Sequence, residues 1–453
     1  MKPGETLDLP KQILDVCTFL DRLELPAWLV GGCLRDICLG RTPTDWDLAT
    51  PCPPDTVREK LEGAGISLWD TGLRHGTLTF RFHGASYEIT TFRQDGPYED
   101  FRRPKWVAFT GSLHDDLARR DFTINAMAYH WKEGLTDPFG GMEDIEKQVI
   151  RAVGSAEARL EEDALRILRG IRFAGSLGFA LDGALSAAMV AKAELLRWIS
   201  PERLAMELRY MVMQPSPAHA MGLLAEIGLW PYLAPEMVAT VGFDQNSAYH
   251  HLSVYDHMVQ TLEHVPAELE IRLAALFHDV AKPVVHTVDE EGKSHFHRHE
   301  LVGADLARGI LNRLRYSHGI RNQVLMLIRH HMLHLKTLSD ERLRQILSDL
   351  PKPRADNLER ILKLQKADLL ASRYTEASME AYESFAQRSK AILDSGCPLD
   401  LTDLEIKGEE LESLGIAPAN RGKALKAMLA EVIRDPAQNQ REVLLEIAAT
   451  FTT

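Results

Sequence analysis

A short apolar run that ends in two glycines is the feature that most constrains this chain. Leu29-Val30-Gly31-Gly32 is typical of a buried strand entering a turn, and Cys33-Leu34-Arg35-Asp36 continues in a helix-compatible pattern. Bare backbone N–H groups in a turn that leads into a helix attract anions. The sequence therefore predicts a small mixed α/β domain built around a phosphate-binding turn.

Two aspartates follow the glycines at a spacing that suits metal binding. Asp45 and Asp47 are separated by one residue, and the pattern predicts a strand over 46–49. Side chains two apart on a strand point to the same face, so both carboxylates can hold hard cations such as Mg²⁺. Phosphoryl transfer commonly uses two such cations ~3.5–4 Å apart. A turn followed by a helix-capping aspartate is the ordinary alternative.

Composition limits the class of protein. A chain of 453 residues exceeds one hydrophobic core, so we expect two to four domains. No apolar run is long enough to span a bilayer and no signal peptide is evident, which predicts a cytoplasmic protein. Five cysteines without a CxxC pair predict reduced, packed thiols. A net charge of −13 disfavours indiscriminate nucleic-acid binding, but arginine clusters leave room for a structured RNA.

Periodicity gives a coarse outline of the elements. We expect a helix over 12–25, a hairpin of strands 77–82 and 86–92 turning at His83-Gly84, and a helix over 113–129. From residue 157 the pattern is helical almost throughout. The predicted fold class is α+β, with a small N-terminal mixed sheet followed by a mostly α-helical remainder.

Five segments in chain order resemble the motifs of the class II tRNA nucleotidyltransferases and bacterial poly(A) polymerases. They are residues 30–36 with Asp45 and Asp47, then 119–126, 137–141, 162–169, and 202–203 with 207–208. The resemblance implies a polymerase β-like nucleotidyltransferase head, a helical neck, a body and a tail. It implies domains over 1–155 (head), 156–230 (neck, base recognition), 231–385 (HD-type metal-binding body) and 386–453 (tail, tRNA binding).

The resemblance also implies roles for individual residues. Asp45 and Asp47 would hold Mg²⁺ and carry the catalysis, with Glu88 on a nearby strand as a third carboxylate candidate. The nucleotide-binding residues implied are Gly31, Gly32, Arg35, Arg120, Asn125, Asp163, Arg166 and Arg169. On one helix, Asp163 and Arg166 would be i, i+3 neighbours and would present an acceptor and a donor fork to the edge of C or A. A surface ion pair is the alternative for these two.

A second constellation consists of histidines and aspartates in the helical half. His257, His278-Asp279, His299, His330 and Asp368 form a spaced series that resembles the HD phosphohydrolase superfamily, with His330 as the candidate ligand although the sequence does not distinguish it from its neighbour His331. Imidazole with carboxylate suits Ni²⁺, Mn²⁺ or another divalent transition metal. The series predicts a metal-dependent phosphodiesterase or phosphatase. A structural helical domain with leftover ligands is the alternative.

The function implied is addition or repair of the 3′-terminal CCA of tRNA from CTP and ATP, by a monomer or homodimer without membrane contact. Relatives restricted to adding CC lack an intact loop corresponding to 93–105, and here that loop is complete. An A-adding enzyme and a poly(A) polymerase remain alternatives, although the latter usually lacks the histidine series. An HD phosphohydrolase with an N-terminal domain that only binds nucleotide or RNA is the alternative from another class, against which Asp45 and Asp47 argue.

Overall fold

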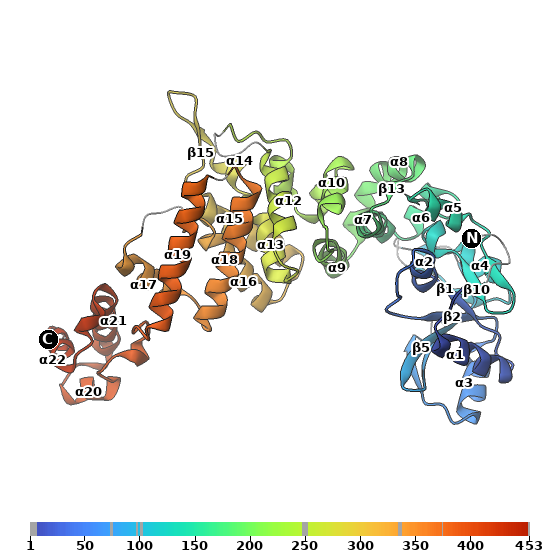
Figure 1. The fold of residues 1–453 in the computed structure, drawn as a ribbon, viewed down its shortest axis with the longest axis horizontal. Helices are drawn as coiled ribbons and strands as arrows, with labels where there is room; N and C mark the ends of the chain where they lie inside the picture. The colour runs from blue at the N-terminus through green and yellow to red at the C-terminus, as the bar shows by residue number, and fades with distance from the viewer. Residues whose placement is uncertain are drawn as a thin grey trace. The chain divides into compact units, whose positions relative to one another are not determined.

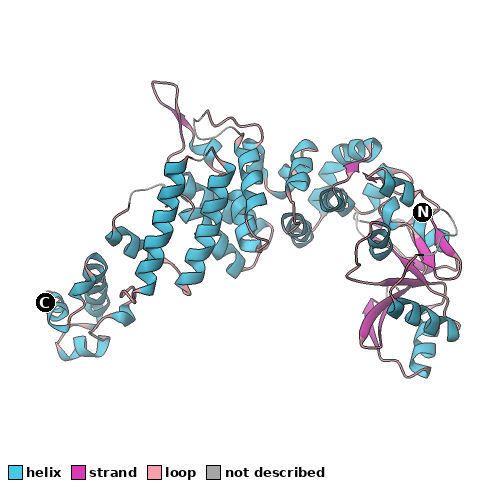
Figure 2. Ribbon diagram, viewed as in Figure 1, coloured by secondary structure: helices cyan, strands magenta, loops and turns pink. Residues whose placement is uncertain are grey.

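A mixed β-sheet and its helices form the first part of the chain, and helices dominate the rest (Figure 1, Figure 2). The computed structural model describes residues 7–72, 76–96, 98–99, 103–246, 252–333, 338–373 and 375–451. The chain divides into two units. One comprises Met1–Val238 with Arg313–Tyr316, and the other comprises Ala239–Asn312 with Ser317–Thr453. The predicted α+β class is confirmed.

Within the described residues, the main sheet of the first unit has seven strands in the order β11-β10-β1-β2-β5-β4-β3. Only β2 and β5 run parallel among neighbouring pairs of the described sheet. The strands are β1 (Trp28–Val30), β2 (Asp47–Thr50), β3 (Leu68–Gly72), β4 (Thr77–Phe82), β5 (Ala85–Thr91), β10 (Ala128–His130) and β11 (Gly134–Thr136).

Local turn chemistry explains the predicted hairpin of β4 and β5. His83 and Gly84 have positive φ angles of 47° and 85°, as the right-handed twist of a two-residue hairpin turn demands. The strands pair from Thr77 opposite Thr90 to Phe82 opposite Ala85. The hairpin predicted from the sequence is confirmed.

Helices surround the sheet and continue beyond it in the first unit. Those near the sheet are α1 (Lys11–Arg22), α2 (Gly32–Cys38), α3 (Pro54–Gly63), α4 (Leu113–Ala118) and α5 (Gly141–Glu146). Those that follow are α6 (Ala156–Glu162), α7 (Leu165–Leu177), α8 (Gly183–Lys192), α9 (Pro201–Val212), α10 (Ala218–Glu226) and α11 (Trp230–Leu233). The 3₁₀ turns are η2 (Thr123–Asn125), η3 (Ala193–Trp198) and η4 (Pro235–Thr240).

Short two-stranded ribbons complete the strands of the first unit. They are β6 (Arg93–Asp95) with β9 (Val107–Phe109), β7 (Tyr98–Glu99) with β8 (Arg103–Pro104), and β12 (Val149–Ile150) with β13 (Ala180–Leu181). The loop predicted over 93–105 therefore contains strands. Its residues 97 and 100–102 lie outside the described part.

The helix predicted over 113–129 is wrong beyond α4. After Ala118 the chain forms η2 and then strand β10, which pairs with β1 through Ala128 opposite Val30. Residues that suggested a helix instead form this buried strand, for example Tyr129 at 2% exposure. Burial on both faces removes the period-2 signal by which a strand is recognised.

The described residues of the second unit are mainly helical, with one ribbon of β14 (Thr287–Val288) and β15 (Ser294–His295). Its first helices are α12 (Val254–His264), α13 (Leu269–Phe277), α14 (Lys282–Val285), α15 (His299–Arg313) and α16 (His318–His330). They continue with α17 (Asp340–Asp349), α18 (Arg354–Ala371) and α19 (Glu376–Asp394). Helix α12 packs against α13 and α18, and α13 packs against α16.

The end of the chain has its own small core. Helices α20 (Gly408–Ser413), α21 (Pro418–Arg434) and α22 (Arg441–Ala449) bury Leu411, Met428 and Leu444 against one another, and η6 (Leu401–Asp403) and η7 (Pro436–Gln438) join them. Among the described helices, none has the length and apolar character that crossing a membrane requires. The five cysteines are free thiols.

Candidate active site and metal centre

The two glycines form the turn between β1 and α2. Gly31 has φ 74° and ψ −139°, a conformation that L side chains rarely adopt. A Cβ on Gly31 would lie 3.1 Å from Nη1 of Arg120 and 3.6 Å from Oδ2 of Asp47. The turn therefore brings its backbone close to the guanidinium of Arg120 and the carboxylate of Asp47.

Three carboxylates lie close together beside this turn. Asp47 begins β2 and pairs in register with Glu88 on the parallel strand β5, so the two side chains share a face. Strand β2 begins at Asp47, one residue later than predicted, so Asp45 lies before the strand in a bend, yet it lines the same pocket as Asp47. Burial, followed by the charge of Asp45, raises the pKa of Asp47, while Arg120 opposes the shift. Burial, Asp47 and Asp45 raise the pKa of Glu88.

Arginines from other segments surround the turn. Arg35 on α2 donates to Oδ1 of Asn125 at 3.0 Å and to Asp36. Arg120 pairs with the buried Asp116 at 3.1 Å. These contacts place Arg35, Arg120 and Asn125 in the pocket with the aspartates, where a triphosphate would meet positive charge.

Asp121 forms an ion pair with Arg169 on helix α7. It accepts from Nε of Arg169 at 2.9 Å and from the backbone N–H of Phe122 at 2.8 Å. Burial alone would raise its pKa, but the ion pair with Arg169 lowers the pKa of Asp121 to about 2. The pair fixes Arg169 at the pocket wall.

The predicted geometry of Asp163 and Arg166 needs a correction. Asp163 is not on a helix with Arg166, because α6 ends at Glu162 and Asp163 is extended (φ −138°, ψ 102°). Its Oδ1 accepts from the backbone N–H of Leu165 at 3.1 Å, a local bond that caps the start of α7 and stops α6 from continuing. Both residues nevertheless line the same pocket.

Each of these two residues has a different partner from the one predicted. Asp163 pairs with Arg203 on α9 at 3.1 Å. Arg166 is 8% exposed and donates to Oε2 of Glu162 at 2.6 Å and to the carbonyl oxygen of Arg119 at 3.0 Å. Arg203 lies in the segment 202–203, which resembles one of the family motifs, but its contact with Asp163 was not predicted.

One pocket of about 720 Å³ is lined by most of the predicted site residues of the first unit, but Glu88 is not among its described lining residues. That lining holds seven arginines and four aspartates, of which Asp45 and Asp47 form an acidic corner. The lining residues are Gly31, Gly32, Arg35, Asp45, Asp47, Arg119, Arg120, Asp121, Asn125, Asp163, Leu165, Arg166, Arg169, Arg172, Phe173 and Arg203. The volume suits a nucleotide-sized ligand.

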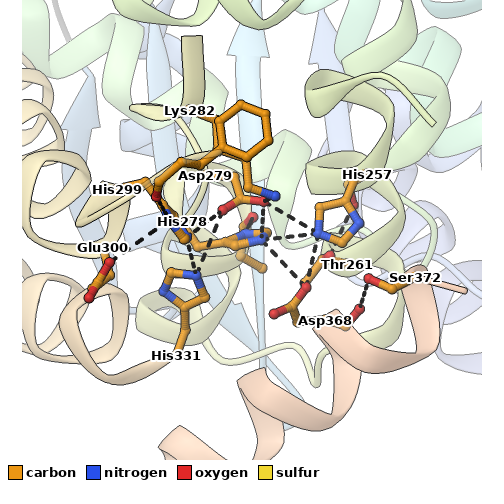
Figure 3. A network of polar contacts seen from close by, with 12 residues as sticks. His257, Thr261, His278, Asp279, Lys282, His299, Glu300, His331, Asp368 and Ser372 are labelled. Carbon is orange, nitrogen blue, oxygen red and sulfur yellow. Dashed lines mark hydrogen bonds and ion pairs between the residues drawn. The ribbon is translucent and has the colours of Figure 1, made fainter. Parts of the chain in front are cut away.

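The second unit contains a buried cluster of histidines and aspartates (Figure 3). Helix α12 supplies His257, the α13–α14 turn supplies His278 and Asp279, and α15, the end of α16 and α18 supply the others, namely His299, His331 and Asp368. Every member is at most 8% exposed. The ligand atoms form overlapping groups that could hold metal ions.

Asp279 lies between two halves of the cluster. Its Oδ2 is 3.3 Å from Nε2 of His278 and 3.5 Å from Nε2 of His257, whereas its Oδ1 is 3.3 Å from Nε2 of His299. Asp368 Oδ1 lies 2.9 Å from Nε2 of His257. A carboxylate that presents one oxygen to each half is suited to bridging two cations.

Hydrogen bonds fix which ring nitrogen is available. Nδ1 of His278, His299 and His331 lies 2.9, 2.8 and 2.7 Å from a backbone carbonyl oxygen, which can only accept. Nδ1 must therefore carry the proton, and a neutral ring offers the lone pair of Nε2 to a metal. Nε2 of His299 and of His331 face each other at 3.2 Å, so a shared proton or a cation held by both lone pairs would keep the two nitrogens together. The donor set fits a divalent metal.

The choice of His330 as a ligand is corrected by the structure. His331 is fully buried in the cluster, while Nδ1 of His330 donates to the carbonyl oxygen of Met326 at 2.8 Å and its side chain stays outside the described ligand groups. Which of two adjacent histidines points into the cluster depends on where helix α16 ends. The sequence does not fix that position to within one residue. Lys282, which donates to Asp279 at 2.7 Å, was also not predicted as part of the site.

Charges stabilise one another inside this cluster. Burial would lower the pKa of His278, but the charge of Asp279 raises it. The pKa of Asp279 is held well below its usual range despite burial, because His278 and Lys282 are adjacent. The lowered pKa of Asp279 favours the ionised carboxylate, which is the form that binds metal, whereas His278 must lose its proton at Nε2 to become a ligand.

Three segments of the chain match known families. Residues 27–151 match the poly A polymerase head domain, 178–240 the probable RNA and SrmB-binding site of polymerase A, and 248–372 the HD domain. The chain therefore carries these three domains in this order.

Curated relatives include CCA-adding enzymes of Geobacillus thermodenitrificans, 47% identical over 49% of this chain and 54% of the relative, and of Geobacillus kaustophilus, 43% identical over 52% and 58%. The chain spans about half the length of these relatives. In fold, the chain is similar to the Bacillus stearothermophilus CCA-adding enzyme in complex with CTP, with a TM-score of 0.69 and 28% identity over 96% of both chains. It shares its fold with the Thermotoga maritima CCA-adding enzyme complexed with tRNA, at a TM-score of 0.61 and 19% identity over 99% and 100%.

Proposed function

We propose that this chain, which joins a poly A polymerase head domain to an HD domain, is a tRNA nucleotidyltransferase that builds or repairs the 3′-terminal CCA from CTP and ATP. The observation that carries the proposal is one pocket in which Asp45 and Asp47 lie with Gly31, Arg35 and the α7 residues. The similarity to CCA-adding enzymes supports the same activity.

The reaction is displacement at the α-phosphate by the 3′-hydroxyl of the RNA, with pyrophosphate leaving. Mg²⁺ held by Asp45 and Asp47 would polarise the α-phosphate and lower the pKa of the attacking hydroxyl. Gly31 leaves its backbone open to the phosphates, since a side chain there would meet Arg120. Arg35 and Arg120 offset the charge that moves onto pyrophosphate.

Base selection is assigned to Asp163 and Arg166. A carboxylate accepts from the amino groups that C and A both carry, and a guanidinium donates to their ring nitrogen. UTP and GTP present a carbonyl and an N–H at those positions, so the same pair would reject them. Arg203 and Glu162 keep the pair in place, because each binds one member directly.

The tRNA would be held by the helical parts of the chain. The segment 178–240 matches a probable RNA-binding region of polymerase A, which supports this role. An A-form stem is recognised largely by shape and by backbone contacts, so a net charge of −13 does not prevent binding at local arginines. We place the protein in the cytoplasm, where free thiols persist.

The proposal is tested with purified protein, a tRNA transcript lacking its CCA end and radiolabelled CTP or ATP. Wild-type protein should transfer label to the RNA in the presence of Mg²⁺, and Asp47→Asn should not. Absence of transfer by the wild-type protein under any divalent metal would contradict the proposal. An A-adding enzyme and a poly(A) polymerase, the alternatives within the class, differ in the length and sequence of the product.

A second activity is favoured by the histidine cluster. A bridging Asp279 and the ring nitrogens of His299 and His331 suit a pair of transition-metal ions such as Ni²⁺ or Mn²⁺. Bound metal would supply an activated nucleophile for phosphoester hydrolysis, and Lys282 beside Asp279 would hold the carboxylate in place. Release of phosphate from 2′,3′-cyclic or 3′-phosphorylated RNA with added Ni²⁺ or Mn²⁺, lost in Asp279→Ala, is the test.

A further inference from the structure

Phe173 on α7 is the one aromatic residue among the described residues that line the nucleotide pocket. Three guanidinium carbons lie over its ring, at 5.2 Å for Arg35, 5.6 Å for Arg169 and 4.7 Å for Arg172. All three distances fall within the ~6 Å at which a cation is attracted to an aromatic face. The ring therefore gathers arginines from two separate helices, α2 and α7.

Each arginine is also held by a polar partner. Arg35 donates to Asn125 at 3.0 Å, Arg169 to Asp121 at 2.9 Å, and Arg172 forms an ion pair with Glu207 at 3.1 Å. A guanidinium held by an acceptor at its edge and by a ring at its face has little freedom left. Arg172 also lies over the ring of Tyr210, 5.1 Å from its centroid, whereas Phe173 is the aromatic ring that Arg35 and Arg169 contact among the described residues.

Bringing three positive groups to one place has an electrostatic penalty. Burial lowers the pKa of Arg172, and the charge of Arg169 adds to that effect while Glu207 opposes it. The negative face of an aromatic ring reduces such repulsion without neutralising the arginines, which remain available to a polyphosphate. The edge of Phe122 packs at 5.8 Å against Phe173 and holds the ring in this orientation.

We infer that Phe173 is a positioning residue that holds Arg35, Arg169 and Arg172 together for binding the nucleotide triphosphate. The inference rests on the proposed function for the identity of the ligand. Phe173 acts through the arginines, so removing the aromatic face should weaken ligand binding and raise KM, whereas kcat at saturating nucleotide should change little.

Calorimetric binding of CTP and of inorganic pyrophosphate tests the inference without turnover. Phe173→Leu should weaken both ligands about tenfold, which corresponds to about 1.4 kcal/mol, and Phe173→Tyr should restore binding. Phe179→Leu is the matched control. Phe179 is 2% exposed just beyond the same helix, and the described part of the chain places no guanidinium over its ring. Equal weakening in Phe179→Leu would overturn the inference.

A fluorinated series at Phe173 separates the ring's charge distribution from its volume. Mono-, di- and trifluorophenylalanine keep nearly the same shape while the negative potential of the face declines, so affinity for pyrophosphate should fall stepwise. Equal affinity for pyrophosphate across the series would overturn the inference and leave the proposed function intact. Wild-type protein that binds neither CTP nor pyrophosphate would instead contradict the proposed function.

Discussion

Asp47 and Glu88 are paired directly across the two parallel strands β2 and β5. Because the side chains share a face and Asp45 lies in the bend just before β2, Glu88 joins the acidic corner from a different segment of the chain. Burial, and then the nearby charges of Asp47 and Asp45, raise the pKa of Glu88.

Glu88→Gln should therefore increase the Mg²⁺ concentration needed for half-maximal nucleotide transfer by at least about tenfold, the low end of what loss of a metal-site partner causes. Titration of activity with Mg²⁺ measures this. Ser86→Ala, two residues earlier on the same face of β5, should leave the Mg²⁺ dependence unchanged. An unchanged Mg²⁺ dependence in Glu88→Gln would mean that Glu88 faces solvent and takes no part in metal binding.

Asp47→Asn should abolish activity yet stabilise the metal-free protein. The pKa of Asp47 is raised in the folded state, by burial first and then by Asp45, so the fold disfavours the ionised form. Stability attributable to Asp47 is therefore lost as pH rises from the ordinary value of 3.8 through the raised pKa. In EDTA at pH 7.5, the variant should have a higher unfolding temperature than wild type, and the gain should vanish at low pH. A lower unfolding temperature at pH 7.5 would contradict the burial argument.

Arg166→Ala should remove discrimination between CTP or ATP and UTP or GTP. The guanidinium supplies a donor fork, and its contacts with Glu162 and the Arg119 carbonyl fix the orientation of that fork. Arg166→Lys keeps the charge without the fork and should lose discrimination as well. Relative kcat/KM for the four nucleotides measures the effect. Unchanged selectivity in both variants would place base recognition elsewhere.

Adjacent histidines provide a matched pair for the metal centre. His331→Ala should reduce bound transition metal and phosphoester hydrolysis about 10–100-fold, because its Nε2 faces His299 and Asp279. His330→Ala should leave both unchanged, since the Nδ1 of His330 is bonded to the Met326 carbonyl outside the cluster. Metal content after dialysis and hydrolysis with Ni²⁺ or Mn²⁺ are the measurements. Equal losses in the two variants would contradict the assignment of His331.

Local turn signals were the part of the fold that could be predicted. The Gly31-Gly32 turn and the His83-Gly84 hairpin depend on the φ angles of one or two residues, which residue type largely determines. The strand β10 was missed because its residues are buried on both faces and its partner β1 is distant in sequence. Pairings of that kind arise from the tertiary fold and leave no periodic trace.

The candidate site could also be predicted only in part. Residue types and order suggested the acidic corner and the histidine series, but the contacts within each depend on where helices end. Asp163 left the helix of Arg166 because it caps α7, and His331 replaced His330 because α16 ends between them. Phe173 could not be singled out, since Arg35 reaches its ring from α2, a contact that depends on the tertiary fold, while Arg169 and Arg172 come from its own helix.

The central claim is that the pocket of the first unit adds C, C and A in turn to a tRNA. The direct test uses tRNA transcripts that end before the first C, after one C and after CC, incubated with CTP alone, ATP alone and both, with products resolved at single-nucleotide length. The account predicts completion to CCA on all three transcripts when both nucleotides are present. Products limited to a single A on the transcript ending in CC would contradict it.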